Sequence, residues 1–407
     1  MVQAQDPPPL TSFFDSPVMA GDPFPFFKVL RATQPVARIA EGFWAIAKYD
    51  DVVRILRDPE TFSSRVSVAD ERGEKRPPTI LFDDPPVHTR MRGLLTKAFT
   101  PRVVELQREA IERNCERMVD AMLAADGPVD YVAGLSYPLP VGVIANMLGV
   151  ADGDLATFKR WSDAIIENVG TALFQPENDA LAEINVEFDA YFKRQLDKLR
   201  THPQDNLLSA LVHAETEDGR LSEEDLLVIC RVLLVAGNET TTGLIVNAAR
   251  VLSDFPHVLD RLRADLDLVP SFIEETLRYY PPFPATLRRT TRDVEIRGVT
   301  IPAGHRIVAL LGSANRDEEA FERADEFLID REPNRHLAFG MGIHYCLGAP
   351  LARLEGQIAM RTLAPRIKRL RVVDAGEGGA LRPGGPKSMM VEFERDPAYA
   401  GGAAGRE

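Results

Sequence analysis

The pattern of hydrophobic and polar positions divides the chain into a mixed N-terminal part, a helical middle and a strand-rich C-terminal part. In the N-terminal part, two short apolar runs, 36–40 and 43–47, flank a Glu-Gly pair. A two-residue loop between such runs is typical of a β-hairpin. A short helix is expected over 50–57, and an irregular loop over 63–86. Long loops inside a compact domain are usually functional, so this loop is a candidate part of a site.

The middle part is predicted to be mainly helical. Thr100-Pro101 supplies a cap followed by a proline, which marks the start of one helix. The longest helix starts at Ser222, because Asp225 three residues later completes a capping box with the acid shortened to aspartate. Its apolar pattern runs to about Leu252, which corresponds to roughly 45 Å at 1.5 Å per residue. A helix of this length that is apolar nearly all round must cross the interior of the molecule.

The C-terminal part returns to strands and loops. Alternating residues over 293–304 predict a second hairpin, and a helix is expected over 349–364. Helix exceeds strand along the chain, so the expected fold class is mainly α with smaller β regions (α+β). The expected organisation is an N-terminal arm over 1–20, a single catalytic domain over 21–397 and a flexible tail over 398–407.

Composition and charge exclude several classes of function. Of 407 residues, 45% are hydrophobic and 27% charged, which is enough apolar material for a large core. The net charge of −13 argues against binding nucleic acid through bulk charge. The three cysteines lie far apart, so neither a disulfide framework nor a structural zinc site is expected. No leader segment or membrane span is evident, since the longest apolar stretch is interrupted by Arg231, and we expect a cytoplasmic protein.

One cysteine lies in an unusual setting. Cys346 stands in FGMGIHYCLG, residues 339–348, where three glycines surround it. Glycines permit tight turns and close approach by a flat ligand. Backbone N–H groups and the N-terminus of the following helix favour the thiolate, which suits a metal that needs one strong axial donor. A buried structural cysteine, and a cysteine nucleophile in an enzyme without haem, are the alternatives.

This segment resembles the haem-binding loop of the cytochrome P-450 family, F-x-x-G-x-[HR]-x-C-x-G. The fixed positions of that pattern are matched by Phe339, Gly342, His344, Cys346 and Gly348. The resemblance extends over nearly the whole chain and implies the cytochrome P-450 fold, with a long central helix over haem b and a cysteine loop beneath it. It also implies that Cys346 ligates the iron and that Phe339, Gly340 and Gly348 contact the cofactor.

A second motif carries the same resemblance. Glu275 and Arg278 are three residues apart, so they share one helix face, and a Pro-Pro pair follows them. Arg331 matches the third member of a buried ion network in the family, although Leu328 stands where an aspartate is often found. The implied role of the three charged residues is structural, namely to brace the loop that carries Cys346.

A third motif, AGNETT over 236–241, lies near the centre of the long helix. Glycine costs about 1 kcal/mol relative to alanine inside a helix. Residues that disfavour a helix, placed between apolar residues at its centre, indicate a functional constraint. Gly237 is expected to let a flat cofactor or dioxygen approach, and Thr240 to hydrogen-bond the carbonyl one turn back. The motif resembles the oxygen-activation segment of the family, which implies that Ala236 and Gly237 contact the cofactor. Glu239 and Thr240 would form its catalytic acid–alcohol pair.

The remaining site predictions concern the edge of the haem and the substrate. The resemblance implies that the two haem carboxylates are bound by His88, Arg92, Arg288, His336 and His344. The predicted pocket is lined by Ile80, Leu81, Val232, Val235, Pro284, Ala285 and Thr286. Because all but the last are apolar, the expected substrate is a small apolar molecule such as a terpenoid, steroid, fatty acid or aromatic compound.

The implied reaction is monooxygenation with O₂, and its electrons must come from another protein, since the chain has no flavin- or nicotinamide-binding fingerprint. The expected donor is an acidic iron–sulfur ferredoxin, or a flavodoxin, reduced by an NAD(P)H-dependent reductase. Residues 331–370 contain seven Lys or Arg against two acids, and 90–102 add four more basic residues. This charge predicts a basic docking face on the cysteine side of the haem. A peroxide-using peroxygenase and a non-catalytic haem-thiolate sensor are the alternatives.

Overall fold

The structure is a computed structural model, and it describes residues 21–67, 79–174, 179–216, 219–376 and 385–399. Its helices are α3 (Phe24–Thr33), α4 (Tyr49–Arg57), α6 (Val87–Ala98), α7 (Pro101–Glu105), α8 (Arg108–Ala124), α9 (Pro138–Met147), α10 (Leu155–Phe174), α11 (Asp179–Thr201), α12 (Leu207–His213), α13 (Glu223–Asp254), α14 (Pro256–Ala264), α15 (Val269–Tyr279), α16 (Leu311–Ala314) and α17 (Ala349–Leu363). Its strands are β1 (Val36–Ala40), β2 (Phe43–Ile46), β3 (Phe62–Ser63), β4 (Val129–Asp130), β5 (Glu215–Thr216), β6 (Gly219–Arg220), β7 (Thr286–Thr290), β8 (Val294–Ile296), β9 (Val299–Ile301), β10 (Arg306–Ala309), β11 (Ile367–Asp374) and β12 (Met390–Arg395). Single 3₁₀ or π turns are η1 (Val132–Ser136), η2 (Asp152–Asp154), η3 (Leu266–Leu268), η4 (Gly342–His344), η5 (Ala364–Arg366) and η6 (Pro397–Tyr399).

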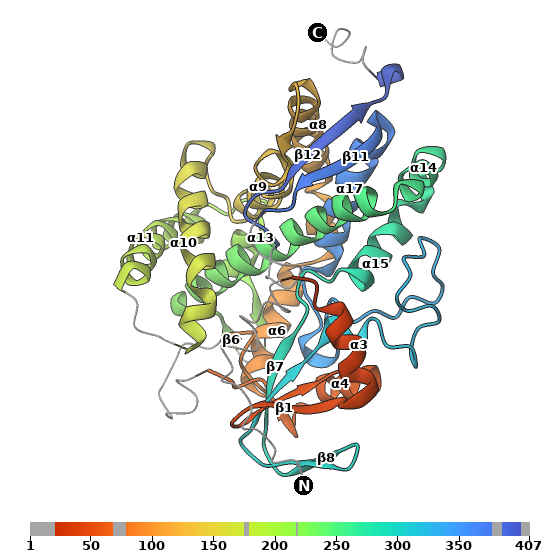
Figure 1. Ribbon diagram of the computed structural model, residues 1–407. Coiled ribbons are helices and arrows are strands. Elements are labelled where there is room, and N and C mark those ends of the chain that lie inside the picture. The colour runs from red at the N-terminus through yellow and green to blue at the C-terminus, as the bar shows by residue number, and fades with distance from the viewer. Residues whose placement is uncertain (1–20, 68–78, 175–178, 217–218, 377–384, 400–407) are drawn as a thin grey trace.

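The long helix α13 crosses the middle of the molecule (Figure 1), as its apolar pattern predicts. The predicted capping box is present, because Ser222 and Asp225 exchange two hydrogen bonds of 3.0 Å between side chain and backbone. Helices α9, α10, α11, α15 and α17 pack against α13. Among the described helices, α13 alone has the length and apolar composition to cross a membrane, yet 56% of its most apolar window is buried inside the protein.

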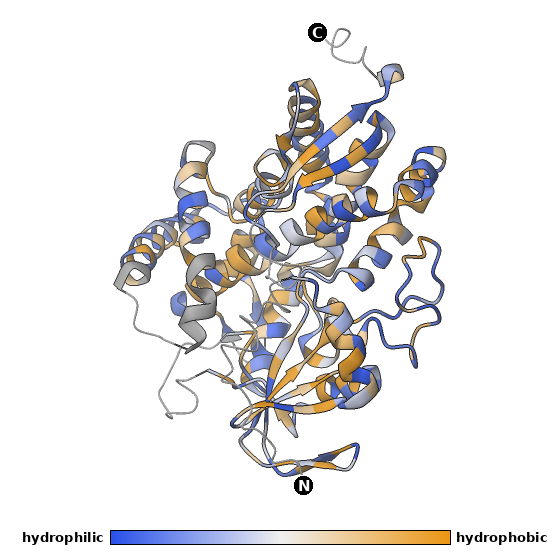
Figure 2. Ribbon diagram, viewed as in Figure 1, coloured by the Kyte–Doolittle hydropathy of each residue, from blue (hydrophilic) through white to orange (hydrophobic). Residues whose placement is uncertain are grey.

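The predicted N-terminal hairpin forms the edge of a five-stranded sheet with the order β1-β2-β10-β7-β3. Val36 pairs with Ile46, so the turn falls where the Glu-Gly pair predicts it. Strand β10 runs parallel to β2 and antiparallel to β7. The sheet therefore joins the N-terminal hairpin to strands from the C-terminal part of the chain. The strands of this sheet are largely hydrophobic (Figure 2), and they pack between α3 and α4. The second predicted hairpin is the separate pair β8–β9.

The helix expected after Thr100 is divided in two. Thr100 caps α7 by accepting a hydrogen bond from the backbone N–H of Val103 at 3.3 Å. The chain then turns, and α8 begins at Arg108. At this turn the buried side chain of Gln107 accepts a hydrogen bond of 2.7 Å from Asn146 on α9. A contact between distant segments therefore accompanies this break, and helical periodicity does not reveal it.

Candidate active site

The cysteine loop, residues 339–348, is a tight turn directly before α17. The backbone N–H of Cys346 donates to the carbonyl of Phe339 at 2.9 Å, which closes the loop. Gly340 and Gly342 adopt φ values of 68° and 71°, a region that disfavours side chains. A Cβ at Gly342 would also collide with the backbone of Leu56 at the end of α4. The glycines are thus required by the fold of the loop and by its close contact with α4.

The sulfur of Cys346 lies at the N-terminus of α17. Burial raises the pKa of this thiol, whereas the N–H groups of Gly348 and Ala349 and the guanidinium of Arg92 lower it. A Cβ at Gly348 would lie 3.9 Å from the sulfur, so the missing side chain leaves the sulfur less covered. Donors that point at a half-buried sulfur favour a bound thiolate over a neutral thiol. The donor set of the loop therefore fits a metal that takes one anionic sulfur ligand.

Basic and imidazole side chains from three separate segments meet beside this loop. His88 on α6 and His344 in η4 have ring centroids 4.2 Å apart. Burial lowers the pKa of His344 to about 3, and the nearby Arg288 and His88 contribute to the shift. Burial likewise lowers the pKa of Arg288 on β7 to about 10, with Asp84 as a partly compensating charge. Arg92, one turn after His88, also has a pKa lowered by burial.

This cluster fits the dicarboxylate edge of a haem. Both ring nitrogens of His88 are buried without a hydrogen-bond partner, and Arg288 is 6% exposed. Buried polar groups are normally hydrogen-bonded, and buried like charges are normally neutralised. An anion with two carboxylates would satisfy both requirements. Sequence reasoning missed one polar neighbour, Ser64, whose hydroxyl lies 2.9 Å from Nε2 of His344.

His336 does not belong to this cluster. The prediction that it binds the haem carboxylates is therefore corrected. Its Nε2 lies 3.1 Å from a carboxylate oxygen of Glu274 on α15, and its side chain is 4% exposed. The same carboxylate accepts two hydrogen bonds from Arg353 on α17. The histidine is therefore satisfied within the protein. Glu274 directly precedes the Glu-x-x-Arg motif, but no local signal indicates that it binds His336.

The centre of α13 has one face that is not covered by protein. Ala236 is exposed, and Glu239 and Thr240 are half-buried, although the nine residues that follow, 241–249, are all buried. The hydroxyl of Thr240 donates to the carbonyl of Ala236 at 2.8 Å, as the sequence predicts. Val232 and Val235 are half-buried on the preceding turns. Open space therefore borders the predicted acid–alcohol pair and its apolar neighbours.

Gly237 is required by the packing of α9 against α13. A Cβ at this position would collide with the side chain of Ile144 on α9, where the Cγ1 atom would be 2.9 Å away. The glycine thus allows α9 to approach α13 closely. The adjacent Asn238 is fully buried and donates to Ser162 on α10 at 2.8 Å. Two helices therefore hold α13 at the turn that carries the acid–alcohol pair, and sequence reasoning missed Asn238.

The predicted pocket residues fall into two groups. Val235 and Ile80 are half-buried and pack against the main core, Val232 is half-buried, and Leu81 is exposed. Pro284 is buried against Gly312 of α16, and Ala285 packs on the core that α3 forms with the sheet. Thr286 accepts a hydrogen bond of 3.3 Å from Arg288. The positions of Pro284, Ala285 and Thr286 are thus explained by contacts within the protein. Residues 68–78 of the predicted pocket loop lie outside the described residues.

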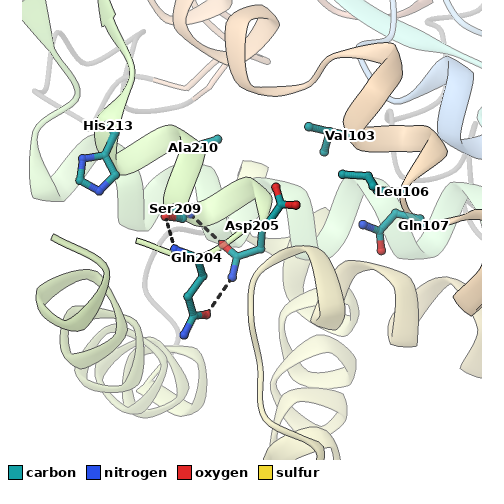
Figure 3. A pocket seen from close by; sticks show the side chains of 9 residues that line it. Val103, Leu106, Gln107, Gln204, Asp205, Ser209, Ala210 and His213 are labelled. Carbon is teal, nitrogen blue, oxygen red and sulfur yellow. Dashed lines mark hydrogen bonds between the residues drawn. The ribbon is translucent and has the colours of Figure 1, made fainter. Parts of the chain in front are cut away.

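A separate pocket of about 190 Å³ lies between the α7–α8 turn and α12 (Figure 3). It contains none of the predicted site residues. Its lining is Val103, Leu106, Gln107, Gln204, Asp205, Asn206, Ser209, Ala210 and His213.

The three residues of the predicted ion network are brought together. Arg278 donates to both carboxylate oxygens of Glu275 at 2.8 Å, and both side chains are fully buried. Arg331 donates to the same carboxylate at 3.1 and 3.2 Å, and Asn334 adds a further hydrogen bond of 3.1 Å. The two arginines also donate to backbone carbonyls between 315 and 326. This network fixes the segment that leads into the cysteine loop.

Comparison with known proteins gives one consistent match. Residues 151–366 match the family model described as cytochrome P450. The chain is 40% identical over 376 residues to cytochrome P450 monooxygenase PikC of Streptomyces venezuelae, covering 88% of this chain and 87% of that protein. The solved structure of cytochrome P450 CYP109Q5 from Chondromyces apiculatus has a TM-score of 0.85 and 38% identity, covering 94% and 97% of the two chains. CYP109E1 from Bacillus megaterium, solved in complex with testosterone, has a TM-score of 0.80 and 36% identity, covering 91% and 99%.

Proposed function

Because this chain belongs to the cytochrome P450 family of haem-b monooxygenases, we propose that it inserts one oxygen atom from O₂ into a small, mainly apolar substrate. The product would be a hydroxylated or otherwise oxidised compound, and the second oxygen atom would leave as water. The observation that carries the proposal is the uncovered face of α13, where Ala236, Glu239 and Thr240 border open space in an otherwise buried helix.

Each group of residues has a separate task. Haem b, when bound, supplies the oxidising chemistry, and the protein supplies orientation and electrostatics. Cys346 would hold the iron through its anionic sulfur, with Phe339, Gly340 and Gly348 around it. His88, Arg92, Arg288 and His344 would bind the two haem carboxylates.

The acid–alcohol pair delivers protons to the oxygen-binding face. The Thr240 hydroxyl donates to a backbone carbonyl at 2.8 Å, so its oxygen is free to accept a hydrogen bond. Glu239 lies one position before it and is half-buried, which suits a group that exchanges protons with water. This pair favours an O₂ cycle over a peroxygenase or a non-catalytic sensor, since hydrogen peroxide brings its own two protons and a sensor consumes none.

An apolar substrate is supported by the side chains next to that face. Val232 and Val235 lie on the turns of α13 that precede Glu239, and both are half-buried. The relative solved with testosterone shows that a steroid fits at least one protein of the same fold. Substrates of that kind bind through buried apolar area, with few polar contacts to fix their orientation.

An isotope experiment tests this function. Candidate terpenoids, steroids, fatty acids and aromatic compounds are first screened for displacement of water from ferric iron by the change in the Soret band. Hits are then incubated with ¹⁸O₂, NAD(P)H, a ferredoxin and its reductase. We expect one ¹⁸O atom per product molecule. Product that forms only with hydrogen peroxide, or a bound haem that never yields product, would refute the proposal.

The electron donor is an acidic ferredoxin, or a flavodoxin, that docks on the cysteine side. The exposed basic residues that support this are fewer than the sequence suggests. Arg331 and Arg353 are engaged by Glu275 and Glu274, and Arg366 pairs with Asp120. Arg102 on α7 and Arg361 on α17 are exposed, and the two helices pack against each other. Arg361 lies 3.9 Å from the exposed carboxylate of Asp267, a longer contact than those of Arg353 and Arg366. We therefore take these two arginines as the core of the proposed docking face.

Salt and charge reversal test this docking face. The rate of the first electron transfer should fall as ionic strength rises, because screening weakens attraction between exposed charges. Arg102→Glu and Arg361→Glu should each slow that transfer at low salt, while Arg38→Glu on β1, in the distant sheet (Figure 1), should not. Stopped-flow absorbance gives the rate. A rate independent of salt, with both variants unaffected, would remove the docking face from the proposal.

The enzyme is proposed to be soluble and cytoplasmic. Its longest apolar helix, α13, is largely enclosed by other helices rather than by lipid-facing surface. A cytoplasmic location would also give access to NAD(P)H and to a soluble electron donor.

A further inference from the structure

Arg353 and Glu274 form a charge-balanced pair next to the cysteine loop. Arg353 on α17 donates to both carboxylate oxygens of Glu274 on α15, at 2.7 and 2.8 Å. Each side chain is 29% exposed, so the pair is largely shielded from water. Bidentate contacts between an arginine and a carboxylate are strong and geometrically specific. The arginine is therefore held in one place and is not a mobile surface charge.

The third member of the group, His336, is held by two hydrogen bonds. The backbone N–H of Ala338 donates to Nδ1 of His336 at 3.2 Å, so Nδ1 is an acceptor. Nε2 then carries the proton and donates to Glu274 at 3.1 Å. Burial alone would raise the pKa of Glu274, but the hydrogen bonds from Arg353 and His336 hold it at about 2. The group thus contains one positive and one negative charge.

The positive member contacts the loop that carries the sulfur. The guanidinium of Arg353 lies 4.5 Å from the ring centroid of Phe339, within the range of a cation–π contact. The carbonyl of Phe339 accepts the hydrogen bond from the backbone N–H of Cys346. Arg353 also donates to the hydroxyl of Tyr345 at 3.3 Å. Its charge lowers the pKa of the Cys346 thiol. Glu274 on α15, by contrast, accepts from the Nε and Nη2 atoms of this guanidinium, whereas Tyr345 accepts from Nη1.

We propose that Arg353 and Glu274 are positioning residues that set the reduction potential of the haem iron through the electrostatic field at Cys346. This inference rests on the proposed haem-thiolate function. Reduction adds one electron to the ferric iron, so a nearby positive charge favours the ferrous state and a nearby negative charge favours the ferric state. The balanced pair keeps these two contributions opposed.

Single neutral substitutions should therefore shift the potential in opposite directions. Arg353→Gln leaves the carboxylate of Glu274 unbalanced, and the potential should fall. Glu274→Gln leaves the guanidinium of Arg353 unbalanced, and the potential should rise. A unit charge in a partly buried position should change the equilibrium constant for reduction on the order of tenfold each way. The double variant restores the balance, so its potential should return close to that of the unmodified protein.

The test is a potentiometric titration of the haem-bound protein with dithionite and mediator dyes, followed by absorbance. It is run at one fixed pH and ionic strength for every variant. Arg361→Gln is the matched control, because it removes one positive charge further along the same helix. The control should leave the potential unchanged. The reduced carbon-monoxide spectrum is recorded first for every variant, to verify the thiolate ligand without any measurement of turnover.

Shifts in the same direction for both single variants, or no shift in either, would overturn the inference. A double variant that does not return toward the original potential would also overturn it, because a purely structural role adds damage instead of cancelling it. If a single variant fails to bind haem, Arg353→Lys is measured instead. It keeps the positive charge, so its potential should match that of the unmodified protein, and a shifted potential would overturn the inference. Failure of the unmodified protein to show the thiolate band would refute the proposed function itself, which separates the two outcomes.

Discussion

Replacing Cys346 with histidine is expected to abolish the long-wavelength Soret band of the reduced carbon-monoxide complex, together with monooxygenase activity. The loop presents the N–H groups of Gly348 and Ala349 to an anionic sulfur, and a neutral imidazole that ligates the iron would have no lone pair left to accept their hydrogen bonds. The longer ring would also have to fit a loop closed by the hydrogen bond to Phe339. The spectrum of the reduced, carbon-monoxide-bound protein measures the effect directly.

The other two cysteines provide matched controls for this experiment. Burial raises the pKa of Cys115 to about 11 and raises that of Cys230 further, so both are protonated thiols in the core. Cys115→Ala and Cys230→Ala remove a sulfur without touching the loop. They should retain the band, with at most a loss of stability from a small cavity. If the band instead survives in Cys346→His, the iron ligand has been assigned to the wrong residue.

Loss of the acid–alcohol pair is expected to produce the second-largest effect. Thr240→Ala should leave haem and substrate binding intact while most electrons from NAD(P)H end in hydrogen peroxide, because the hydroxyl that accepts a hydrogen bond beside the oxygen-binding face is gone. Glu239→Gln should slow product formation by about 10²–10⁴-fold, the usual contribution of a positioned acid or base. Oxygen consumption, peroxide and product are measured in the same reaction, so that uncoupling and slow turnover are distinguished.

Two further variants check that the effect comes from the hydroxyl itself. Thr240→Ser keeps a hydroxyl at this position and should recover most of the coupling. Thr242 lies two residues later on α13, where its buried hydroxyl donates to Asn238 at 3.3 Å. Thr242→Val removes that hydroxyl and should lower stability without diverting electrons to peroxide. Full coupling in Thr240→Ala, or equal uncoupling in Thr242→Val, would contradict the proposed role.

The sequence by itself determines the features that depend on neighbouring residues. The capping box at Ser222, the hairpin turn after residue 40 and the start of α17 at Ala349 all appear where local patterns place them. A cap, a two-residue turn and a glycine with positive φ each follow from contacts within a few residues. The back-bond from Thr240 to Ala236 is local for the same reason. The family motif adds the cysteine and the paired charges, because its spacing is fixed along the chain.

Only the tertiary structure decides which distant groups meet. His336 was expected at the haem carboxylates, yet Glu274, 62 residues away in sequence, binds it. Gly237 has no side chain because Ile144 of α9 occupies the space that a Cβ would need. Arg353 was counted as free surface charge, yet the same Glu274 holds it. A carboxylate binds whichever donors the packing of helices brings within about 3 Å, and side-chain chemistry specifies only that some donor is needed. The position of that donor is set by how α15, α17 and the cysteine loop pack, and no local pattern encodes it.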